Sequence, residues 1–172
     1  MTSVIRGDDN FDTAVGDNVV QTHLITTSSQ SITASTLTNI SGLNATITPS
    51  TTSKRIKVIV RWSGEFSTTN NYSCVYGIKR DAIDVGNPAS VGSRLVGIAV
   101  VAQGYHDPDG SSTQDSVFYS YIDSPATTSA TTYHATYLHN SSGTLYNQRT
   151  VSDVNTNNYE RLTSTIILEE ID

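Results

Sequence analysis

The sequence predicts an all-β protein, an antiparallel β-sandwich of the jelly-roll type, and two observations carry this prediction. Serine and threonine together make up about 28% of the 172 residues, far above their usual share in a globular chain. Threonine favours pleated sheets because its side chain is branched, and serine favours turns because it bonds nearby backbone. In several segments apolar and polar residues alternate with a period of two, whereas no window has the spacing of an amphipathic helix.

The first strands are expected near the amino terminus. Residues 18–26 alternate clearly, residues 30–37 do so more weakly, and residues 44–48 form a short strand that stops at Pro49. Proline has no backbone N–H to donate to a ladder, so a strand is expected to end there.

The central strands have the strongest patterns. In residues 55–63 four apolar side chains alternate with Lys57, Ile59 and Arg61, as in a half-buried strand. Residues 72–80 repeat the pattern. Residues 95–102 are nearly all apolar, which is typical of a strand that is covered on both faces.

The last strands lead to the carboxyl end. Residues 116–122 alternate again, residues 132–140 and 144–150 are expected to form a hairpin around Gly143, and residues 164–170 close the sheet. The spacing of these strands is typical of a sandwich or barrel. Three longer gaps suit crossings between two sheets, and they cover residues 81–94, 105–114 and 123–131.

Residues 1–17 differ from the rest in composition. Four aspartates surround the single Phe11, and Gly7 and Gly16 break any regular pattern. We therefore expect residues 1–17 to form an arm, and residues 18–172 to form one β-sandwich domain.

Charge and composition argue against several classes of protein. The net charge of −6 does not suit a nucleic-acid binder, which needs a positive field to meet phosphates. The longest apolar run falls short of the roughly 20 residues that cross a membrane. The single Cys74 excludes an intrachain disulfide, and its place in an alternating segment predicts a small buried hydrophobe.

The short motifs of the chain favour ordinary structure over chemistry. Arg6-Gly-Asp8 matches an adhesion tripeptide, but a turn of the arm explains it. Residues 106–115 look like a calcium loop, yet they lack the EF-hand spacing, and a Pro-Asp-Gly turn accounts for them. Glu169 and Glu170 should point to opposite faces, which argues against a glycosidase pair.

The four histidines lack the spacing of metal ligands, and we expect them on solvent-exposed or interface faces. They are His23, His106, His134 and His139. We therefore expect no enzyme, and no catalytic, cofactor or metal site.

Five tyrosines on three neighbouring expected strands are candidates for a subunit or ligand interface. Tyrosine is enriched at interfaces because it is large, stiff and carries a polar tip. The alternative is that these side chains fill the core of the sandwich. The five are Tyr119, Tyr121, Tyr133, Tyr137 and Tyr146.

Several segments resemble small virion-surface proteins of bacteriophages. Residues 42–60, 123–133 and 162–171 carry the resemblance, and residues 3–12 are similar to the start of phage tail-fibre proteins. The resemblance covers most of the chain. It implies a compact homotrimeric jelly roll on the virion surface, made in the host cytoplasm and without a cofactor.

The resemblance also implies partners and a point of attachment. The arm would bind other virion proteins, capsid or tail subunits, through Ile5, Arg6, Asp9 and Phe11, and a host-surface glycan would be a further partner. A long shaft, as typical fibres have, is missing from the pattern. We therefore expect either a short tail-fibre or receptor-binding module, or a capsid decoration protein that docks through its arm.

Overall fold

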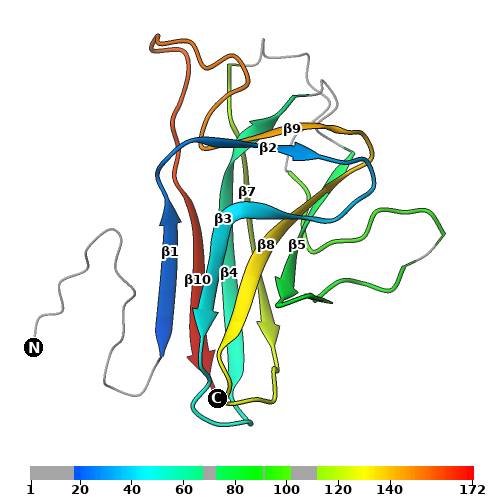
Figure 1. Cartoon of the computed structure of the whole chain (residues 1–172), viewed down its shortest axis with the longest axis vertical. Coiled ribbons are helices and arrows are strands. Elements are labelled where there is room, and N and C mark those ends of the chain that lie inside the picture. Colours follow the sequence, from blue (N-terminus) through cyan, green and yellow to red (C-terminus); the bar gives the residue numbers. More distant parts are fainter. Residues whose placement is uncertain (1–17, 68–72, 91, 102–111) are drawn as a thin grey trace, which may run out of the picture.

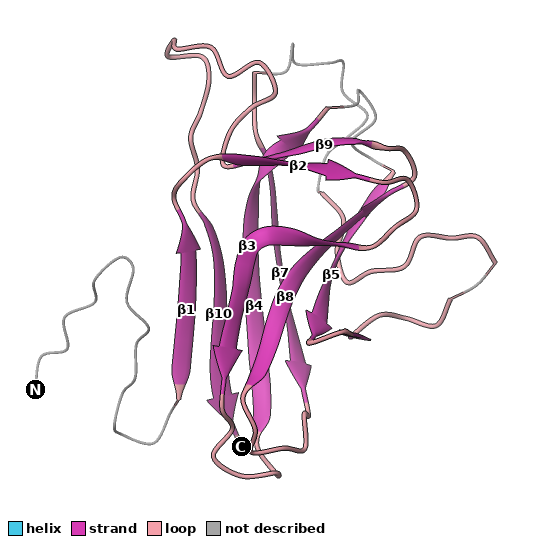
Figure 2. Cartoon of the chain, viewed as in Figure 1, coloured by secondary structure: helices cyan, strands magenta, loops and turns pink. Residues whose placement is uncertain are grey.

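The computed structural model describes residues 18–67, 73–90, 92–101 and 112–172, and in these residues the chain is all-β without a helix. Two antiparallel sheets, A and B, pack face to face (Figures 1 and 2). The predicted all-β, antiparallel sandwich is thereby confirmed.

Sheet A is built around the long strand β4. On one edge β4 pairs first with β10 and then, at its end, with β9, while β7 pairs with the other edge. The outer strands β1 and β2 pair with β10 and β9. The strands of sheet A are β1 (Val19–Leu24), β2 (Ser28–Ile32), β4 (Arg55–Phe66), β7 (Asp115–Asp123), β9 (Gly143–Asn147) and β10 (Ser164–Ile171).

Sheet B has four strands in the order β3-β8-β5-β6. The ladder between β3 and β8 shifts register between Asn39 and Asn44, where Gly42 has a φ of 77°. A residue without a Cβ adopts this left-handed conformation without strain. The strands of sheet B are β3 (Thr38–Ile47), β5 (Cys74–Arg80), β6 (Ile83–Val85) and β8 (Thr131–His139).

The core lies between the two sheets and follows the predicted alternation. In β4 the side chains of Ile56, Val58, Val60 and Trp62 are all fully buried, and Lys57, Ile59 and Arg61 point to the other side. At about 25 cal/mol per Å² of apolar surface removed from water, such side chains supply the main stabilisation of the fold.

An aromatic cluster joins the two sheets in the part of the core near the end of β4. Trp62 of sheet A lies 5.2 Å from Tyr76 and 6.4 Å from Tyr137 of sheet B, measured between ring centroids. Phe66 lies 5.5 Å from Tyr137 and 4.5 Å from His139. Aromatic rings bury large areas and gain further from tilted contacts of this kind, so the cluster fixes how the sheets face each other.

The predicted hairpin of residues 132–140 and 144–150 is wrong. The strands β8 and β9 belong to different sheets, because β8 pairs with β3 and β5 while β9 pairs with β2 and β4. A Cβ on Gly143 would lie 2.6 Å from the Phe66 ring. This glycine is thus required by packing against Phe66, and its presence did not signal a hairpin turn.

The expected strand at 95–102, covered on both faces, is also wrong. In residues 95–101 only Ala99 forms a bridge, to Tyr76, and Val100 is 59% exposed. The edge of β5 is already occupied by β6 over Ile78–Arg80, so little backbone is left for a second ladder. Residue 102 lies outside the described part of the chain.

The expected crossings between sheets hold in part. The gap at 123–131 does carry the chain from β7 of sheet A to β8 of sheet B. The gap at 81–94 first returns on itself, because Asp81 turns with a φ of 52° and β6 pairs with β5. Most of the gap at 105–114 lies outside the described residues.

One buried polar network ties the sheets together near their lower end. The Arg80 guanidinium of β5 donates to the Asp123 carboxylate of β7 at 2.8 Å, and the Tyr133 hydroxyl of β8 donates to the same oxygen at 2.7 Å. Burial raises the pKa of the Tyr133 phenol, and the hydrogen bond to Asp123 raises it further.

We expect Asp123→Ala to lower the free energy of unfolding by about 2–4 kcal/mol, because a buried hydroxyl and a mostly buried guanidinium lose their acceptor. Urea unfolding followed by circular dichroism measures this loss. Asp84→Ala is the control, since Asp84 is exposed and such changes stay within about 0.5 kcal/mol. Equal stabilities of the two variants would contradict the role of Asp123.

Candidate functional site

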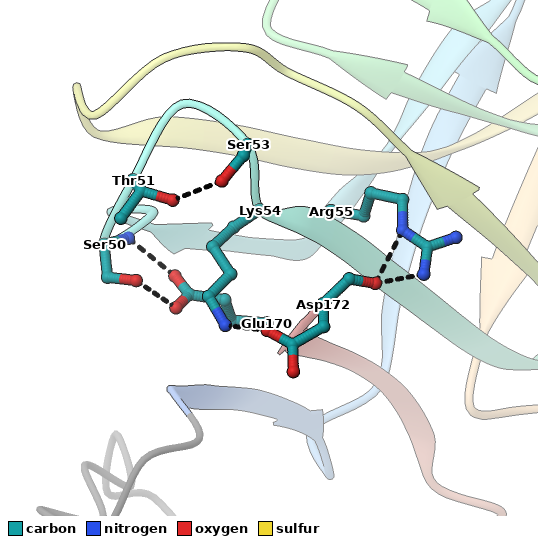
Figure 3. A network of polar contacts seen from close by, with 7 residues as sticks. All are labelled: Ser50, Thr51, Ser53, Lys54, Arg55, Glu170 and Asp172. Carbon is teal, nitrogen blue, oxygen red and sulfur yellow. Dashed lines mark hydrogen bonds and ion pairs between the residues drawn. The ribbon is translucent and has the colours of Figure 1, made fainter.

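The base of the sandwich is the end at which the chain's carboxyl terminus is held (Figure 3). Glu170 of β10 is 4% exposed and accepts hydrogen bonds from the Ser50 backbone N–H at 2.7 Å and from the Ser50 hydroxyl. Lys54 pairs with the Asp172 carboxylate, and the Arg55 guanidinium donates to the Asp172 carbonyl. The pKa of the Asp172 carboxyl is lowered, mainly by its hydrogen bond to Lys54. The loop before β4 thus fastens the last residues of the chain.

The same base holds the point where residues 1–17 join the sandwich. Asn18 accepts a backbone hydrogen bond from Glu170 at 2.9 Å, and its side-chain amide donates to the Thr48 carbonyl at 3.0 Å. Both bonds fix the root of the predicted arm beside the carboxyl terminus. The predicted attachment residues Ile5, Arg6, Asp9 and Phe11 lie outside the described residues, as does the Arg6-Gly-Asp8 tripeptide.

The opposite end of the sandwich carries the long connection between β9 and β10, residues 148–163 (Figure 1). Asp153 forms ion pairs with Arg149 at 3.4 Å and with Arg161 at 2.6 Å. Residues 155–158 and Glu160 are exposed. Since β10 runs from this end to the base, the loop and the chain's carboxyl end lie at opposite poles of the molecule. We call the end that carries the β9–β10 connection the distal end.

A third region, the open face, is the outer surface of sheet A, formed by β1, β10, β4 and β7. Antiparallel register places Ile167 beside Ile59, and Arg61 beside Phe118. Phe118 is 71% and Ile122 45% exposed, although both are large and apolar. The open face comprises Val19, Gln21, His23, Lys57, Ile59, Arg61, Phe118, Ser120, Ile122, Thr165, Ile167 and Glu169.

The outer surface of sheet B is different in character. The ladder there aligns Asn44, His134, Lys79 and Asp84 in one row across four strands, and none of the four is apolar. Burial lowers the pKa of His134, with nearby Lys79 acting in the same direction and Asp81 against it. This row is polar, unlike the open face, although sheet B does expose Ile83 of its edge strand β6, which is 59% exposed.

The tyrosines predicted as core or interface divide between two environments. Tyr119, Tyr133 and Tyr137 are at most 5% exposed and lie in the core, so a partner cannot reach their side chains. Tyr121 is half-buried beneath Gly86, whose Cβ would lie 2.7 Å from its ring. Tyr146 is half-buried, and the Arg149 guanidinium covers its ring at 4.8 Å from the centroid.

The described histidines also lie in different environments. His23 lies half-buried on the open face, with Nδ1 2.9 Å from the Thr165 hydroxyl. His134 and His139 point to opposite faces as expected, but the expectation of an exposed or interface site is wrong for His139, which is fully buried against Phe66. His106 lies outside the described residues.

Two smaller predictions are confirmed. Cys74 is 4% exposed, and burial raises the pKa of its thiol to about 11, so it behaves as a small buried hydrophobe. Glu169 and Glu170 point to opposite faces, the former pairing with Lys57 at 3.1 Å on the open face and the latter binding Ser50.

The open face was missed as a candidate site, although the sequence held a signal for it. In residues 55–63 and 116–122 the side of each strand that faces away from the core still contains Ile59, Phe118 and Ile122. A solvated sheet face is normally polar at such positions. When a strand of an antiparallel sheet carries apolar residues on its outer side as well as on its core side, the outer side is therefore indicated as a second contact surface.

Among the described residues, no three His, Cys, Asp or Glu side chains are grouped so that they could hold a metal ion. That part of the chain also contains no helix long and apolar enough to span a membrane. Neither the known protein-family models nor the curated proteins include a match to this sequence.

Proposed function

We propose that this chain is a non-enzymatic structural protein of a bacteriophage virion, a homotrimeric projection of the short tail-fibre or receptor-binding type. The observation that carries the proposal is that the two ends of the sandwich differ. Asn18 and Asp172 are both held at the base, whereas the long β9–β10 connection, with exposed residues 155–158, lies at the distal end. A protein that projects from a surface needs one end for attachment and the other for contact.

The strand order supports a jelly roll as the type of sandwich. From β2 to β5 successive strands alternate between the sheets, and from β6 to β9 they alternate again. Such repeated crossing is how jelly rolls wind two sheets from one chain. In this proposal residues 1–17 bind capsid or tail subunits, and the distal loops bind a host-surface glycan.

A capsid decoration protein is the second candidate, and the fastening of Asn18 favours it. Two hydrogen bonds hold the root of residues 1–17, so that a pull on this segment is borne by the base of both sheets. A cement protein needs such a firm root, but it needs no receptor at the distal end. The two candidates therefore differ in the function of the distal loops.

Deleting residues 1–17 is expected to leave a folded trimer that no longer joins the virion. Quantitative mass spectrometry of purified particles measures incorporation, and circular dichroism with light scattering checks fold and mass. Normal incorporation of the truncated protein would rule out attachment through residues 1–17.

A glycan array then separates the two candidates with the intact chain. Specific glycan binding that is lost when residues 155–158 are replaced by Gly and Ser, but kept when residues 128–130 at the base are replaced, supports the receptor-binding module. If deletion of residues 1–17 abolishes incorporation and the intact chain binds no glycan, the result supports the decoration protein.

A further inference from the structure

Buried polar side chains hold both legs of the β9–β10 connection at the distal end. Glu65 of β4 is 5% exposed, and its carboxylate accepts the Val151 backbone N–H of the outgoing leg at 2.6 Å. Gln114, just before β7, is 8% exposed, and its amide donates to the Glu160 carbonyl of the returning leg at 2.7 Å. Burying polar groups costs free energy unless they are hydrogen-bonded, so the fold uses these two side chains to fix an exposed loop.

The Asp153 carboxylate ties the two legs to each other. It pairs with Arg149 of the outgoing leg at 3.4 Å and with Arg161 of the returning leg at 2.6 Å. The Asp153 backbone N–H also donates to the hydroxyl of the buried Thr150 at 3.1 Å. We call residues 154–161, beyond this ion pair, the tip. Because its two ends are fixed, the tip has little conformational freedom to lose when it binds a ligand, and such preorganisation raises affinity.

The tip presents amide and hydroxyl side chains to solvent. The Tyr159 backbone N–H donates to the Thr156 carbonyl at 3.4 Å, so residues 156–159 form a β-turn with Asn157 and Asn158 at its central positions. Residues 155–158 are all exposed, and Tyr159 beside them is half-buried. Asparagine amides and threonine hydroxyls supply both donors and acceptors, which is what a ligand rich in hydroxyl groups requires.

The two arginines that bind Asp153 differ in what they leave open to solvent. Arg149 is 25% exposed, and its guanidinium donates to two backbone carbonyls at 3.0 and 2.9 Å and lies 4.8 Å from the centre of the Tyr146 ring. Arg161 is 53% exposed, and within the described part of the chain its guanidinium contacts only Asp153. An arginine has five N–H donors in a planar fork, so Arg161 keeps donors that face solvent. The three side chains together carry one positive charge, which is accessible at Arg161.

We propose that the tip binds an acidic glycan, in which the solvent-facing donors of Arg161 hold the carboxylate of a uronic-acid-type sugar. Guanidinium and carboxylate pair through two parallel hydrogen bonds, which are stronger than bonds between neutral groups. The amides of Asn157 and Asn158 bind neighbouring hydroxyls, and these uncharged groups favour a sugar over an acidic peptide. Asp153 is a positioning residue, because it orients Arg161 without touching the ligand. This inference rests on the proposed receptor-binding function and names the class of glycan that the distal end recognises.

Matched ligands and variants of the intact chain test the inference. A glycan array selects the acidic glycan that binds best, and the same glycan with its carboxyl groups reduced to alcohols is the neutral probe. By isothermal titration calorimetry we expect the acidic form to bind about tenfold more tightly than the reduced form. Arg161→Gln should weaken binding of the acidic form about tenfold and leave the reduced form unchanged. Arg94→Gln is the control, since Arg94 is an exposed arginine outside the β9–β10 connection, and Glu160→Gln should not weaken binding because it removes a negative charge.

The outcomes separate this inference from the function on which it rests. Equal binding of the acidic and reduced glycans overturns the carboxylate contact and leaves the receptor-binding function intact. An equal loss of both ligands in a folded Arg161→Gln variant, checked by circular dichroism, means that Arg161 only shapes the tip and overturns its assigned contact. Binding of polyglutamate as tight as that of the acidic glycan contradicts a sugar ligand. If no glycan on the array binds, the inference fails together with the receptor-binding function.

Discussion

Replacing Trp62 with alanine is expected to lower the free energy of unfolding by about 3–5 kcal/mol, the range observed when buried aromatic residues are truncated to alanine. Trp62 is fully buried and joins both sheets through Tyr76 and Tyr137. Its indole N–H also donates to the Asn147 side chain at 2.8 Å, and Asn147 is fully buried. The truncation therefore leaves a cavity and removes the donor of a buried acceptor. For a domain of typical stability, about 5–15 kcal/mol, this loss is a large share of the total.

The measurement is urea unfolding followed by far-ultraviolet circular dichroism, because Trp62 is the single tryptophan and its fluorescence disappears with it. All variants are compared at one protein concentration, since association would add to apparent stability. Trp62→Phe keeps a ring but loses the indole N–H, and we expect an intermediate loss. Ile25→Ala, at an exposed position, should change stability by less than about 0.5 kcal/mol. A Trp62→Ala variant as stable as Ile25→Ala would contradict the central role of this side chain.

Alkaline pH is expected to unfold the protein in one steep transition at about pH 11 to 13. Burial is the main cause that raises the pKa values of four tyrosines, and it also raises the pKa of the Cys74 thiol to about 11. The four are Tyr76, Tyr119, Tyr133 and Tyr137.

The direction of the pH effect follows from proton binding. Below an unfolded-state pKa of about 10 these phenols are protonated in both states, so their contribution to stability is fully present. Above it the unfolded chain releases protons that the folded chain keeps, and stability falls as pH rises. Each group contributes about 1.4 kcal/mol per pH unit, so four groups contribute about 6 kcal/mol per unit. A stability of 5–15 kcal/mol is then lost within about one to three units.

Phenolate absorbance and far-ultraviolet circular dichroism, recorded against pH, check this expectation. The four buried phenols should ionise only with the loss of sheet structure, so that part of the absorbance change coincides with the circular dichroism transition. Tyr76→Phe should make the fall in stability less steep by about a quarter, because one of the four groups is removed. Ionisation of all tyrosines near pH 10 with an intact sheet signal would contradict the burial of these groups.

Sequence patterns predicted the direction of side chains well. The period of two in residues 55–63 placed Ile56 and Trp62 inside and Lys57 outside, as the structure has them. The same pattern predicted the burial of Cys74 and the opposite directions of Glu169 and Glu170. Alternation is a local property of a strand, so it can be recognised without knowing what the strand pairs with.

The same patterns failed where strand pairing was concerned. Residues 132–150 contain two strands with a glycine between them, yet every partner of β8 and β9 lies more than 50 positions away along the chain. Tyr76 and Tyr137, for example, pair across 61 positions. Residues 95–102 are apolar, yet a neighbour on the edge of β5 leaves them little room. Neither fact is encoded in the segments themselves.

Local patterns and composition were therefore enough to predict the class of fold and the in-or-out direction of most strand residues, and they showed the acidity of residues 1–17. The pairing of distant segments set which strands share a sheet. It also placed three of the five candidate tyrosines in the core and left Phe118 and Ile59 on the same open face. The physical reason is that periodicity is set by neighbours in the chain, whereas burial on the second face of a strand depends on whether distant segments cover it. In this sandwich the inner face of sheet A is covered by sheet B, while Phe118 on the outer face stays exposed.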